Sequence, residues 1–266
     1  MKPASPAWPA LTALLTLVVL SGCRALPTPP VPPPTAVASA EELLARLQNR
    51  ERTIESFQAR GRITFLSPER NYSGTALIKA RRPENLRVDI LDLFGRTLLS
   101  FASDGAEVQV LSPHEGKFFR GPASPRNLAA FIPPAVTLPQ ALRLLVGALP
   151  LSPGPPSKFD YDPAAGQYLL EWRQAEGLKE RLWVAAQGLY PLKDEYFGGA
   201  ERPRFTAELA DFGETVPDFP GKITLKTEAP KLELRLAYKE LSLNPPLAPA
   251  DLTLTPPAGM AVVQLP

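Results

Sequence analysis

The chain has 266 residues, of which 44% are hydrophobic, and carries a formal net charge of +2. This length fits one large all-β domain or two small ones, and the apolar content is enough to build a core. The small charge, with Lys and Arg scattered along the chain, argues against a polyanion binder, so no nucleic-acid partner is expected. A single Cys and a single His exclude an intrachain disulfide, a Cys/His zinc site and a Cys-His catalytic pair.

The N-terminus has the pattern of an export signal. Lys2 precedes an apolar run from Ala10 to Leu20, which is too short to span a bilayer and is typical of the central region of a secretory signal peptide. Leu20-Ser21-Gly22-Cys23 then resembles the lipobox of bacterial lipoproteins. The resemblance implies that residues 1–22 are removed and that Cys23 is acylated on its sulfur, as palmitate labelling would detect, and on its amino group.

The lipobox also bears on location. Two or three acyl chains hold a protein at a membrane more firmly than one chain, which gives only marginal binding. In lipoproteins an Asp after the Cys implies retention in the inner membrane, and here that residue is Arg24. The resemblance therefore implies an outer-membrane lipoprotein facing the periplasm of a diderm bacterium. The alternative is a buried structural Cys that follows a signal peptide.

A proline-rich segment separates Cys23 from the folded part. Pro27–Pro34 reads P-T-P-P-V-P-P-P, which favours polyproline II rather than helix or central strand. At about 3.1 Å per residue, these eight positions span roughly 25 Å. We therefore expect an acylated Cys and a semi-rigid spacer over residues 23–38 and a single folded domain over residues 39–266.

Two capping boxes indicate helices. Ser39-Ala-Glu-Glu42, followed by apolar residues at helical spacing, predicts an amphipathic helix from about Ala40 to Glu55. Thr137-Leu-Pro-Gln140, with an apolar stripe after it and Gly147 as a candidate C-cap, predicts a short helix between two β segments. A turn of helix around residues 127–131 is expected just before it.

Elsewhere the apolar period is two, and short turns separate the runs. The predicted strands are Phe57–Phe65, Tyr72–Arg81, Leu86–Ile90, Thr97–Phe101, Glu107–Leu111, Lys117–Arg120, Lys158–Asp162, Gln167–Arg173, Lys179–Ala186, Pro191–Phe197, Phe205–Phe212, Lys222–Thr227 and Lys231–Leu243. Residues 261–265 are a further candidate, as an edge strand. The pattern indicates an antiparallel meander, interrupted once by the short helix.

The connection between two of these strands is unusual. Leu93-Phe94-Gly95-Arg96 joins the runs Leu86–Ile90 and Thr97–Phe101, and its Gly supplies the backbone freedom of a tight turn. Two large apolar side chains thus stand where hairpins normally place polar ones. Either they fold back onto the core, or they form an apolar tip for a lipid or a partner.

These elements predict a mainly β fold with helices, of the α+β class. We expect a strongly curved antiparallel sheet that forms an open, unclosed barrel, with helices covering its concave side. A cup of this kind can hold a small ligand, as closed barrels of about eight strands do. The alternative is that the helices fill the cup and leave no cavity.

Candidates for catalysis are few. His114 follows Pro113 in a predicted turn, where an exposed imidazole is the ordinary outcome. Asp89, Asp92 and Asp104 flank turns, and nothing in the pattern places a nucleophile beside them. We therefore expect no enzyme activity, no metal and no cofactor.

Several runs, in matching order between about Glu41 and Tyr238, resemble the LolA/LolB family and, within it, the LolB branch of outer-membrane lipoprotein receptors. They are F57-Q-A-R-G-R-I, N71-Y-S-G-T-A-L, L86-R-V-D-I-L-D-L-F-G-R-T-L, G116-K-F-F and the helix that starts at T137. The resemblance implies an open β-barrel with a helical lid and a hydrophobic cavity that accepts lipoprotein acyl chains.

The resemblance also assigns site residues. In the LolB branch a short loop carries an exposed leucine, in a Pro-Leu-Gly setting, that is needed to insert cargo into the membrane. Leu93, Phe94 and Gly95 occupy the matching positions here, with Phe94 at the leucine. The residues expected to line the cavity are Ile63, Phe65, Ile78, Val88, Ile90, Leu99, Phe101, Leu170, Trp172 and Val184.

The sequence thus leads to one functional expectation. It is an outer-membrane lipoprotein, anchored by its acyl chains and monomeric, that binds the acyl chains of lipidated cargo or other lipids and acts in protein transport as a chaperone. A soluble periplasmic LolA-like carrier is the implied partner. The alternative is a structural or lipid-binding lipoprotein of an envelope assembly that transfers nothing.

Overall fold

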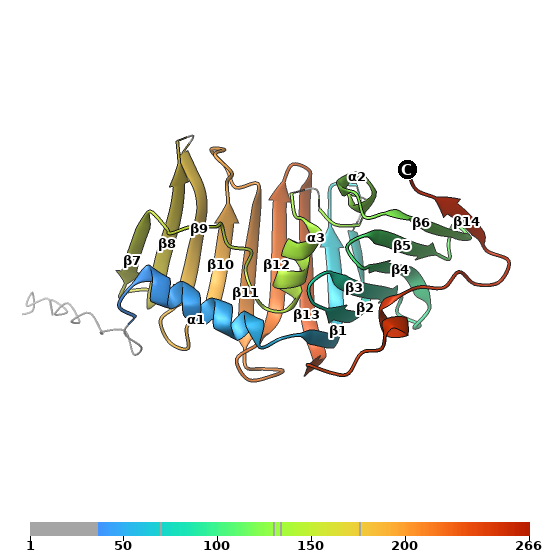
Figure 1. Ribbon diagram of the computed structural model, residues 1–266, viewed down its shortest axis with the longest axis horizontal. Coiled ribbons are helices and arrows are strands. Elements are labelled where there is room, and N and C mark those ends of the chain that lie inside the picture. The colour runs from blue at the N-terminus through green and yellow to red at the C-terminus, as the bar shows by residue number, and fades with distance from the viewer. Residues whose placement is uncertain (1–36, 70, 130, 134, 176) are drawn as a thin grey trace, which may run out of the picture. The chain divides into compact units, whose positions relative to one another are not determined.

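The computed structural model describes residues 37–266 except 70, 130, 134 and 176 (Figure 1). These residues lie in one compact unit of the chain. The predicted signal peptide, Cys23 and the proline-rich run Pro27–Pro34 lie outside the described residues.

Helix α1 (Ala40–Arg52) begins where the capping residue predicts. Ser39 Oγ accepts a hydrogen bond from the N–H of Glu42 at 3.2 Å, which satisfies one of the backbone donors that every helix leaves free at its start. The predicted helix is confirmed, but it ends three residues before Glu55. The chain leaves the helix because Ile54 turns into the core, where it is 5% exposed.

The described residues form one fourteen-stranded sheet. Its strands are β1 (Ser56–Leu66), β2 (Asn71–Arg81), β3 (Asn85–Leu91), β4 (Thr97–Ser103), β5 (Glu107–Ser112), β6 (Lys117–Pro122), β7 (Lys158–Asp162), β8 (Gln167–Gln174), β9 (Gly177–Ala185), β10 (Pro191–Tyr196), β11 (Phe205–Phe212), β12 (Pro220–Glu228), β13 (Lys231–Leu243) and β14 (Ala261–Gln264). The spatial order is β14-β6-β5-β4-β3-β2-β1-β13-β12-β11-β10-β9-β8-β7. The predicted strands are confirmed, including the one near the end of the chain.

Two pairings join strands that are distant in the sequence. β1 pairs antiparallel with β13, which fuses the first meander to the second. A bulge between Arg60 and Gly61 bends this ladder, and a Cβ on Gly61 would lie 2.6 Å from the carbonyl oxygen of Ala237. β14 pairs with β6 in parallel, whereas the other pairs are antiparallel. The sheet ends at β7 and β14 and is therefore not closed into a barrel.

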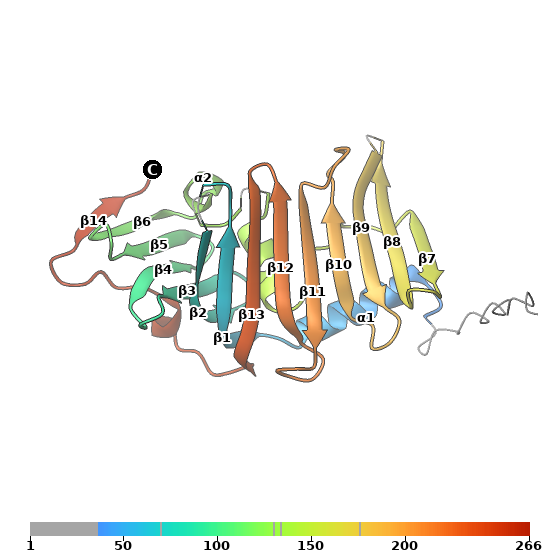
Figure 2. The same cartoon turned by 180° about the vertical axis from the view of Figure 1, so that it is seen from behind.

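Within the part of the chain that the structure describes, three short helices complete the fold. α2 (Pro125–Leu128) follows β6, α3 (Leu138–Leu145) carries the predicted capping box between Thr137 and Gln140, and the 3-10 helix η1 (Pro249–Leu252) precedes β14. Figures 1 and 2, which show opposite sides, place α1 and α3 on the same face of the sheet. The segment between α3 and β7 crosses this face as well.

The core lies between this face and the helices. Its centre is an aromatic group in which Phe57, Phe219 and Tyr238 have ring centroids 5.7 to 5.9 Å apart. The hydroxyl of Tyr238 donates a hydrogen bond to the carbonyl oxygen of Leu145 at 2.9 Å. This bond fixes the end of α3 to β13, because it satisfies a carbonyl that the helix itself leaves free.

Candidate functional site

A cavity among the described residues lies beside α3 and has a volume of about 600 Å³. Strands β1 to β4 and β12 to β13 supply one side of it, and α3 with the residues just before it supplies the other. The lining residues are Ile63, Phe65, Asn71, Tyr72, Ile78, Leu86, Val88, Ile90, Leu99, Phe101, Ala129, Phe131, Ile132, Pro133, Val136, Ala141, Leu144, Leu145, Ile223, Leu225, Pro230, Leu232, Leu234 and Leu236. Its volume is in the range of about 300–1,000 Å³ that is usual for small-molecule sites.

The lining of this cavity is almost entirely apolar. Among the described lining residues, only Asn71 and Tyr72 carry polar side-chain groups. The hydroxyl of Tyr72 donates to the carbonyl oxygen of Leu91 at 3.2 Å. Burial raises the pKa of Tyr72, and the negative charge of Asp92 adds to the effect, so the phenol stays neutral. The cavity offers no charged group to a ligand, and it suits hydrocarbon.

The loop that joins β3 to β4 and contains Leu93 and Phe94 lies at the same end of the sheet as one end of the cavity. Phe65 pairs with Tyr72 across the β1–β2 hairpin, and both line the cavity. The hydrogen bond from Tyr72 ends on Leu91, the last residue of β3, directly before the loop that contains Phe94. A molecule leaving the cavity at this end would therefore emerge beside the loop.

The loop itself is held rigidly by one carboxylate. Asp92 accepts hydrogen bonds from the N–H of Phe94 at 2.8 Å and of Arg96 at 2.9 Å, and it pairs with the Arg96 guanidinium at 2.7 Å. The N–H of Arg96 is the main reason that the pKa of Asp92 is lowered. Gly95 adopts a φ of +79°, which a side chain would strain. Leu93 and Phe94 are held outward, 85% and 84% exposed.

This exposure decides between the two interpretations of the loop. Leu93 and Phe94 do not fold back onto the core. Apolar side chains of this size are normally buried, and here a polar network presents them to solvent. The guanidinium of Arg96 also lies over the Phe94 ring, 5.5 Å from its centroid, in a cation-π contact.

Seven of the ten residues predicted to line a cavity lie together along this one: Ile63, Phe65, Ile78, Val88, Ile90, Leu99 and Phe101. The structure places the other three elsewhere. Leu170 and Val184 are fully buried in the core, and Trp172 donates from Nε1 to the carbonyl oxygen of Gly154. Trp172 thus contacts the segment between α3 and β7, and none of the three side chains lines the cavity.

Sequence reasoning missed the wall opposite these strands. Leu144 and Leu145 of α3 and Phe131 before it line the cavity, although they were expected only as helix positions, and Ile132 lines it without having been predicted. Residues of β12 and β13 were expected as strand positions, but not as cavity lining. Alternation of apolar and polar residues along a strand shows which side chains point to the apolar face of the sheet. It does not show whether a helix or another segment packs on that face.

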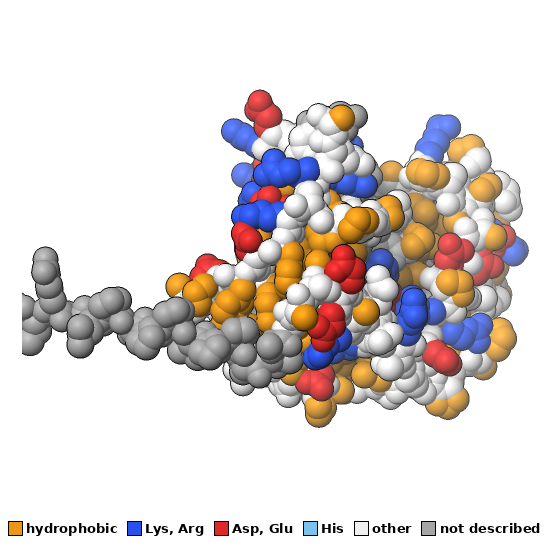
Figure 3. All heavy atoms as spheres, turned by 60° about the vertical axis from the view of Figure 1, so that its left-hand side comes forward, with side chains coloured by type: hydrophobic (Ala, Val, Ile, Leu, Met, Phe, Trp, Pro, Cys, Tyr) orange, Lys and Arg blue, Asp and Glu red, His pale blue; other side chains and the backbone are white. Residues whose placement is uncertain are grey.

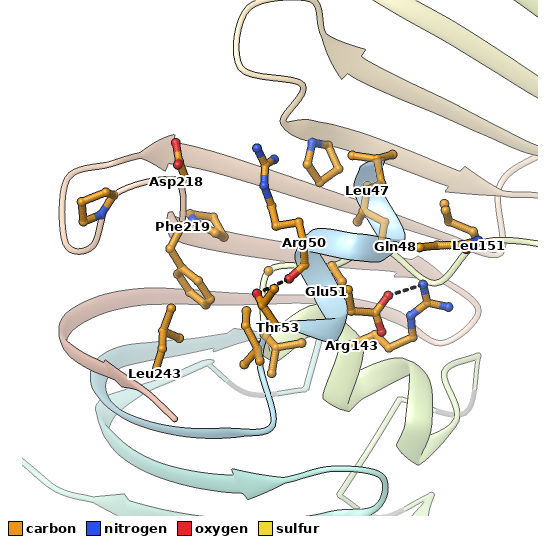
Figure 4. Close-up of a pocket in the computed structure, with 18 residues that line it drawn as sticks. Leu47, Gln48, Arg50, Glu51, Thr53, Arg143, Leu151, Asp218, Phe219 and Leu243 are labelled. Atoms are coloured by element: carbon orange, nitrogen blue, oxygen red, sulfur yellow. Dashed lines mark hydrogen bonds and ion pairs between the residues drawn. The ribbon is translucent and has the colours of Figure 1, made fainter. Parts of the chain in front are cut away.

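A second pocket, of about 350 Å³, lies beside the C-terminal half of α1 (Figure 4). It differs from the first because charged side chains enter it. Arg143 of α3 reaches Glu51 of α1 at 2.7 Å, and Arg82 pairs with the other oxygen of the same carboxylate at 3.0 Å. These bonds tie α3 to α1. Figure 3, in which the β7 end of the sheet comes forward, shows hydrophobic side chains among Lys, Arg, Asp and Glu groups on the surface.

Two buried acids lie under the segment between α3 and β7. Glu180 of β9 accepts a hydrogen bond from the N–H of Ser152 at 2.7 Å. Asp194 of β10 is fully buried, and its carboxylate oxygens have no hydrogen-bond partner among the described residues. Burial, together with the charge of Glu180, raises the pKa of Asp194 well above its usual range and favours its protonated form.

Other kinds of site were sought in the same part of the chain. Among the described residues, no group of three or more His, Cys, Asp or Glu side chains is arranged to hold a metal ion. No helix among them combines the length and the apolar character needed to cross a bilayer.

Solved structures of other proteins share the fold of this unclosed, mostly antiparallel sheet. A LolA superfamily protein from Nitrosomonas europaea is similar with a TM-score of 0.52 at 18% identity, over 82% of this chain and 99% of that one. An outer membrane lipoprotein-sorting protein domain from Vibrio parahaemolyticus gives 0.53 at 12% identity, over 79% and 94%. A DUF1329 family protein from Desulfovibrio piger gives 0.57 at 11% identity, over 80% and 95%.

These structures establish the fold. The chain has a LolA/LolB-like fold, as its sequence predicted, and the similarity does not single out the LolB branch. Identities below 20% carry no residue-level assignment. No family model matches the chain, and no curated protein matches it in sequence.

Proposed function

We propose that this chain is an envelope lipoprotein that binds the acyl chains of lipidated cargo in the cavity beside α3 and passes them to a membrane at the loop Leu93-Phe94-Gly95. The observation that carries the proposal is the composition of the cavity wall, which is apolar apart from Asn71 and Tyr72 among its described residues. Burying hydrocarbon there is favourable by about 0.8 kcal/mol per CH₂. Transfer then needs no covalent step, only a difference in affinity between donor, cavity and bilayer.

The helices have a role in this proposal. α1 and α3 would cover the concave side of the sheet, with α3 as the removable part of the cover, because its residues Ala141, Leu144 and Leu145 form one wall of the cavity. The exposed side chains of Leu93 and Phe94 would enter the interfacial region of the bilayer while the acyl chain leaves beside them.

The anchor completes the proposal. Acylation of Cys23 and the proline-rich spacer would hold a monomeric domain at the periplasmic face of the outer membrane, within reach of a soluble LolA-like carrier. The carrier and the cargo are proposed on the fold and the sequence alone. The competing function is a structural lipoprotein of an envelope assembly, whose cavity would bind nothing that exchanges.

A binding experiment with matched variants separates these two functions. A dansyl-labelled fatty acid is titrated into the purified protein and displaced with a diacylated lipopeptide. Ala141→Phe places a ring in the cavity and should weaken binding at least tenfold, whereas Ala164→Phe, in the exposed β7–β8 turn, should not change it. Saturable binding that Ala141→Phe weakens at least tenfold, and that Ala164→Phe leaves unchanged, supports the proposal. If the native protein binds no probe, the structural function stands instead.

A further inference from the structure

The last 23 residues, Asn244–Pro266, form a strap across the face of the sheet opposite the cavity. Its contacts identify the face: Lys79 pairs with Asp251 at 2.6 Å, and Arg87 donates to the carbonyl oxygen of Thr253 at 3.0 Å. Their strand neighbours Ile78 and Val88 line the cavity, and successive strand residues point to opposite faces. The strap ends as β14, the edge strand of the sheet, which pairs with β6; Figures 1 and 2 both place β6 beside α2.

The strap has a firmly held part and a loosely held part. Leu252 and Leu254 are 3% and 9% exposed, and Leu254 packs in a small cluster with Phe118 and Ala102. β14, in contrast, buries little: Val262 is 49% exposed, and only Val263 of its four residues is half-buried. Residues 255–259 between the two parts are exposed. β14 can therefore leave β6 while the rest of the strap stays in place.

The end of the strap also contacts the wall of the cavity. The side-chain amide of Asn127 in α2 is buried and donates to the carbonyl oxygens of Pro122 and Pro266, each at 2.9 Å. Phe131, which follows α2, lines the cavity and packs against Phe101 with ring centroids 5.6 Å apart. When Pro266 leaves, Asn127 loses a partner for a buried donor, which destabilises the position of α2.

We propose that the edge of β6 is a strand-acceptor site. β14 occupies it in the isolated chain, and an extended segment of a partner protein, parallel to β6 and apolar at alternate positions, replaces β14 and loosens the cavity wall at α2. The proposed effect of strand exchange on the cavity rests on the acyl-binding function proposed above. The strand-acceptor site itself does not depend on that function. Main-chain hydrogen bonds would supply the affinity, and pockets for alternate side chains the specificity, as in other cases of strand addition.

The chemistry of the accepted segment can be derived from β14. The N–H of Leu265 donates to the carbonyl oxygen of Arg120 at 2.7 Å, and the side chain of Leu265 packs against the main core. Val263 is half-buried and pairs with Phe119, which also packs against that core. A Cβ on Gly121 would lie 2.7 Å from Cβ of Leu265, so β6 is shaped for close approach at this position. The site therefore fits an aliphatic residue at each of these two positions.

Three full-length variants test the proposal, each in a Cys23→Ser background that leaves no other thiol. Leu265→Pro removes the donor to Arg120 and should release β14. Gln264→Pro is the matched control, because strand N–H groups alternate in direction and this one points away from β6. Arg120 of β6 and Gln264 of β14 lie opposite each other in the strand register. With both replaced by Cys, oxidation should form a disulfide that holds β14 on β6. The reduced form of the same protein is its control.

Two measurements are made on every variant, after circular dichroism has confirmed folding. A fluorescein-labelled peptide with the sequence of residues 260–266 should bind the Leu265→Pro variant in fluorescence anisotropy, at least tenfold more tightly than it binds the oxidised pair. A peptide with Glu in place of Val263 and Leu265 should not bind. The dansyl fatty acid should dissociate at least threefold faster from the Leu265→Pro variant than from the Gln264→Pro variant or the oxidised pair.

Each outcome decides a separate point. Absence of peptide binding to the Leu265→Pro variant overturns the acceptor site. Equal dissociation rates of the fatty acid from the oxidised pair, the reduced pair and the Leu265→Pro variant overturn the coupling to the cavity. A concentration-dependent dimer of the native chain would instead make a second copy the occupant and overturn the partner segment. If no form binds the fatty acid, the proposed acyl-binding function fails, and the peptide measurement still decides the acceptor edge.

Discussion

Replacing Phe94 by Glu separates the stability of the protein from its proposed transfer function. The side chain of Phe94 is 84% exposed, so about one sixth of its surface is buried. Full burial of a Phe side chain is worth about 1.5–3 kcal/mol, and one sixth of that is about 0.2–0.5 kcal/mol. For a domain of this size 1 kcal/mol shifts Tm by about 2–4 °C, so Phe94→Glu should lower Tm by less than about 2 °C.

The same substitution should abolish delivery to a membrane. A carboxylate at the tip opposes entry into the apolar part of the interface, whereas the cavity is unchanged. The variant should therefore bind the dansyl fatty acid with native affinity and release it into liposomes at least tenfold more slowly. The assay is the loss of dansyl fluorescence on mixing loaded protein with vesicles that contain a quencher.

Two further variants serve as controls for Phe94→Glu. Phe101 is 5% exposed and lines the cavity, so Phe101→Ala should cost about 3–5 kcal/mol and show the melting behaviour of a buried ring. Ala164→Glu adds the same charge in the exposed β7–β8 turn, near the opposite edge of the sheet, and should leave transfer unchanged. A Phe94→Glu protein that melts like the native chain and transfers at the native rate would refute the role of the loop.

Three further predictions concern the buried acid, the loop and the anchor. Asp194→Asn should raise Tm at pH 8 by at least about 3 °C and change it little at pH 4. The pKa of Asp194 is raised in the folded protein, so the native protein loses stability as the pH rises and this buried carboxyl must ionise. Equal Tm changes at both pH values would contradict this. Asp92→Ala should speed amide hydrogen exchange at Phe94 and Arg96 at least tenfold in NMR; unchanged exchange rates would contradict the role of Asp92 in holding the loop. Cys23→Ser should leave the precursor uncleaved and without incorporated palmitate; normal palmitate incorporation would exclude the lipobox.

The strands and helices of this chain could be predicted because each is encoded locally. Alternating apolar residues along β2 and β3 specify one buried face, and the capping boxes at Ser39 and Thr137 specify where helices begin. Long-range pairing is not encoded in this way. The order of the meander followed from its short turns, but the contact of β1 with β13 and the parallel placement of β14 depend on segments more than 100 residues apart.

The candidate site, like the fold, could be predicted where its features are encoded locally in the sequence and not where they depend on distant segments. Leu93 and Phe94 could be recognised as unusual turn residues, but exposure depends on the hydrogen bonds of Asp92, which sequence alone does not reveal. The apolar faces near Ile78 and Leu170 have the same pattern. They differ in their surroundings: Ile78 borders the open cavity beside α3, whereas Leu170 is packed within the core.

The size of the helices explains why the cavity lies where it does. α1 has 13 residues and is about 20 Å long, and with the segment between α3 and β7 it covers the strands around β8 to β11 (Figure 1). The cavity lies over six other strands, which span about 24 Å at a spacing of about 4.8 Å. α3 has 8 residues and is only about 12 Å long, so it cannot fill that width. The residues just before α3 share the wall with it, and extending α3 would add side chains to the cavity, so the short length of the helix helps to keep the cavity open.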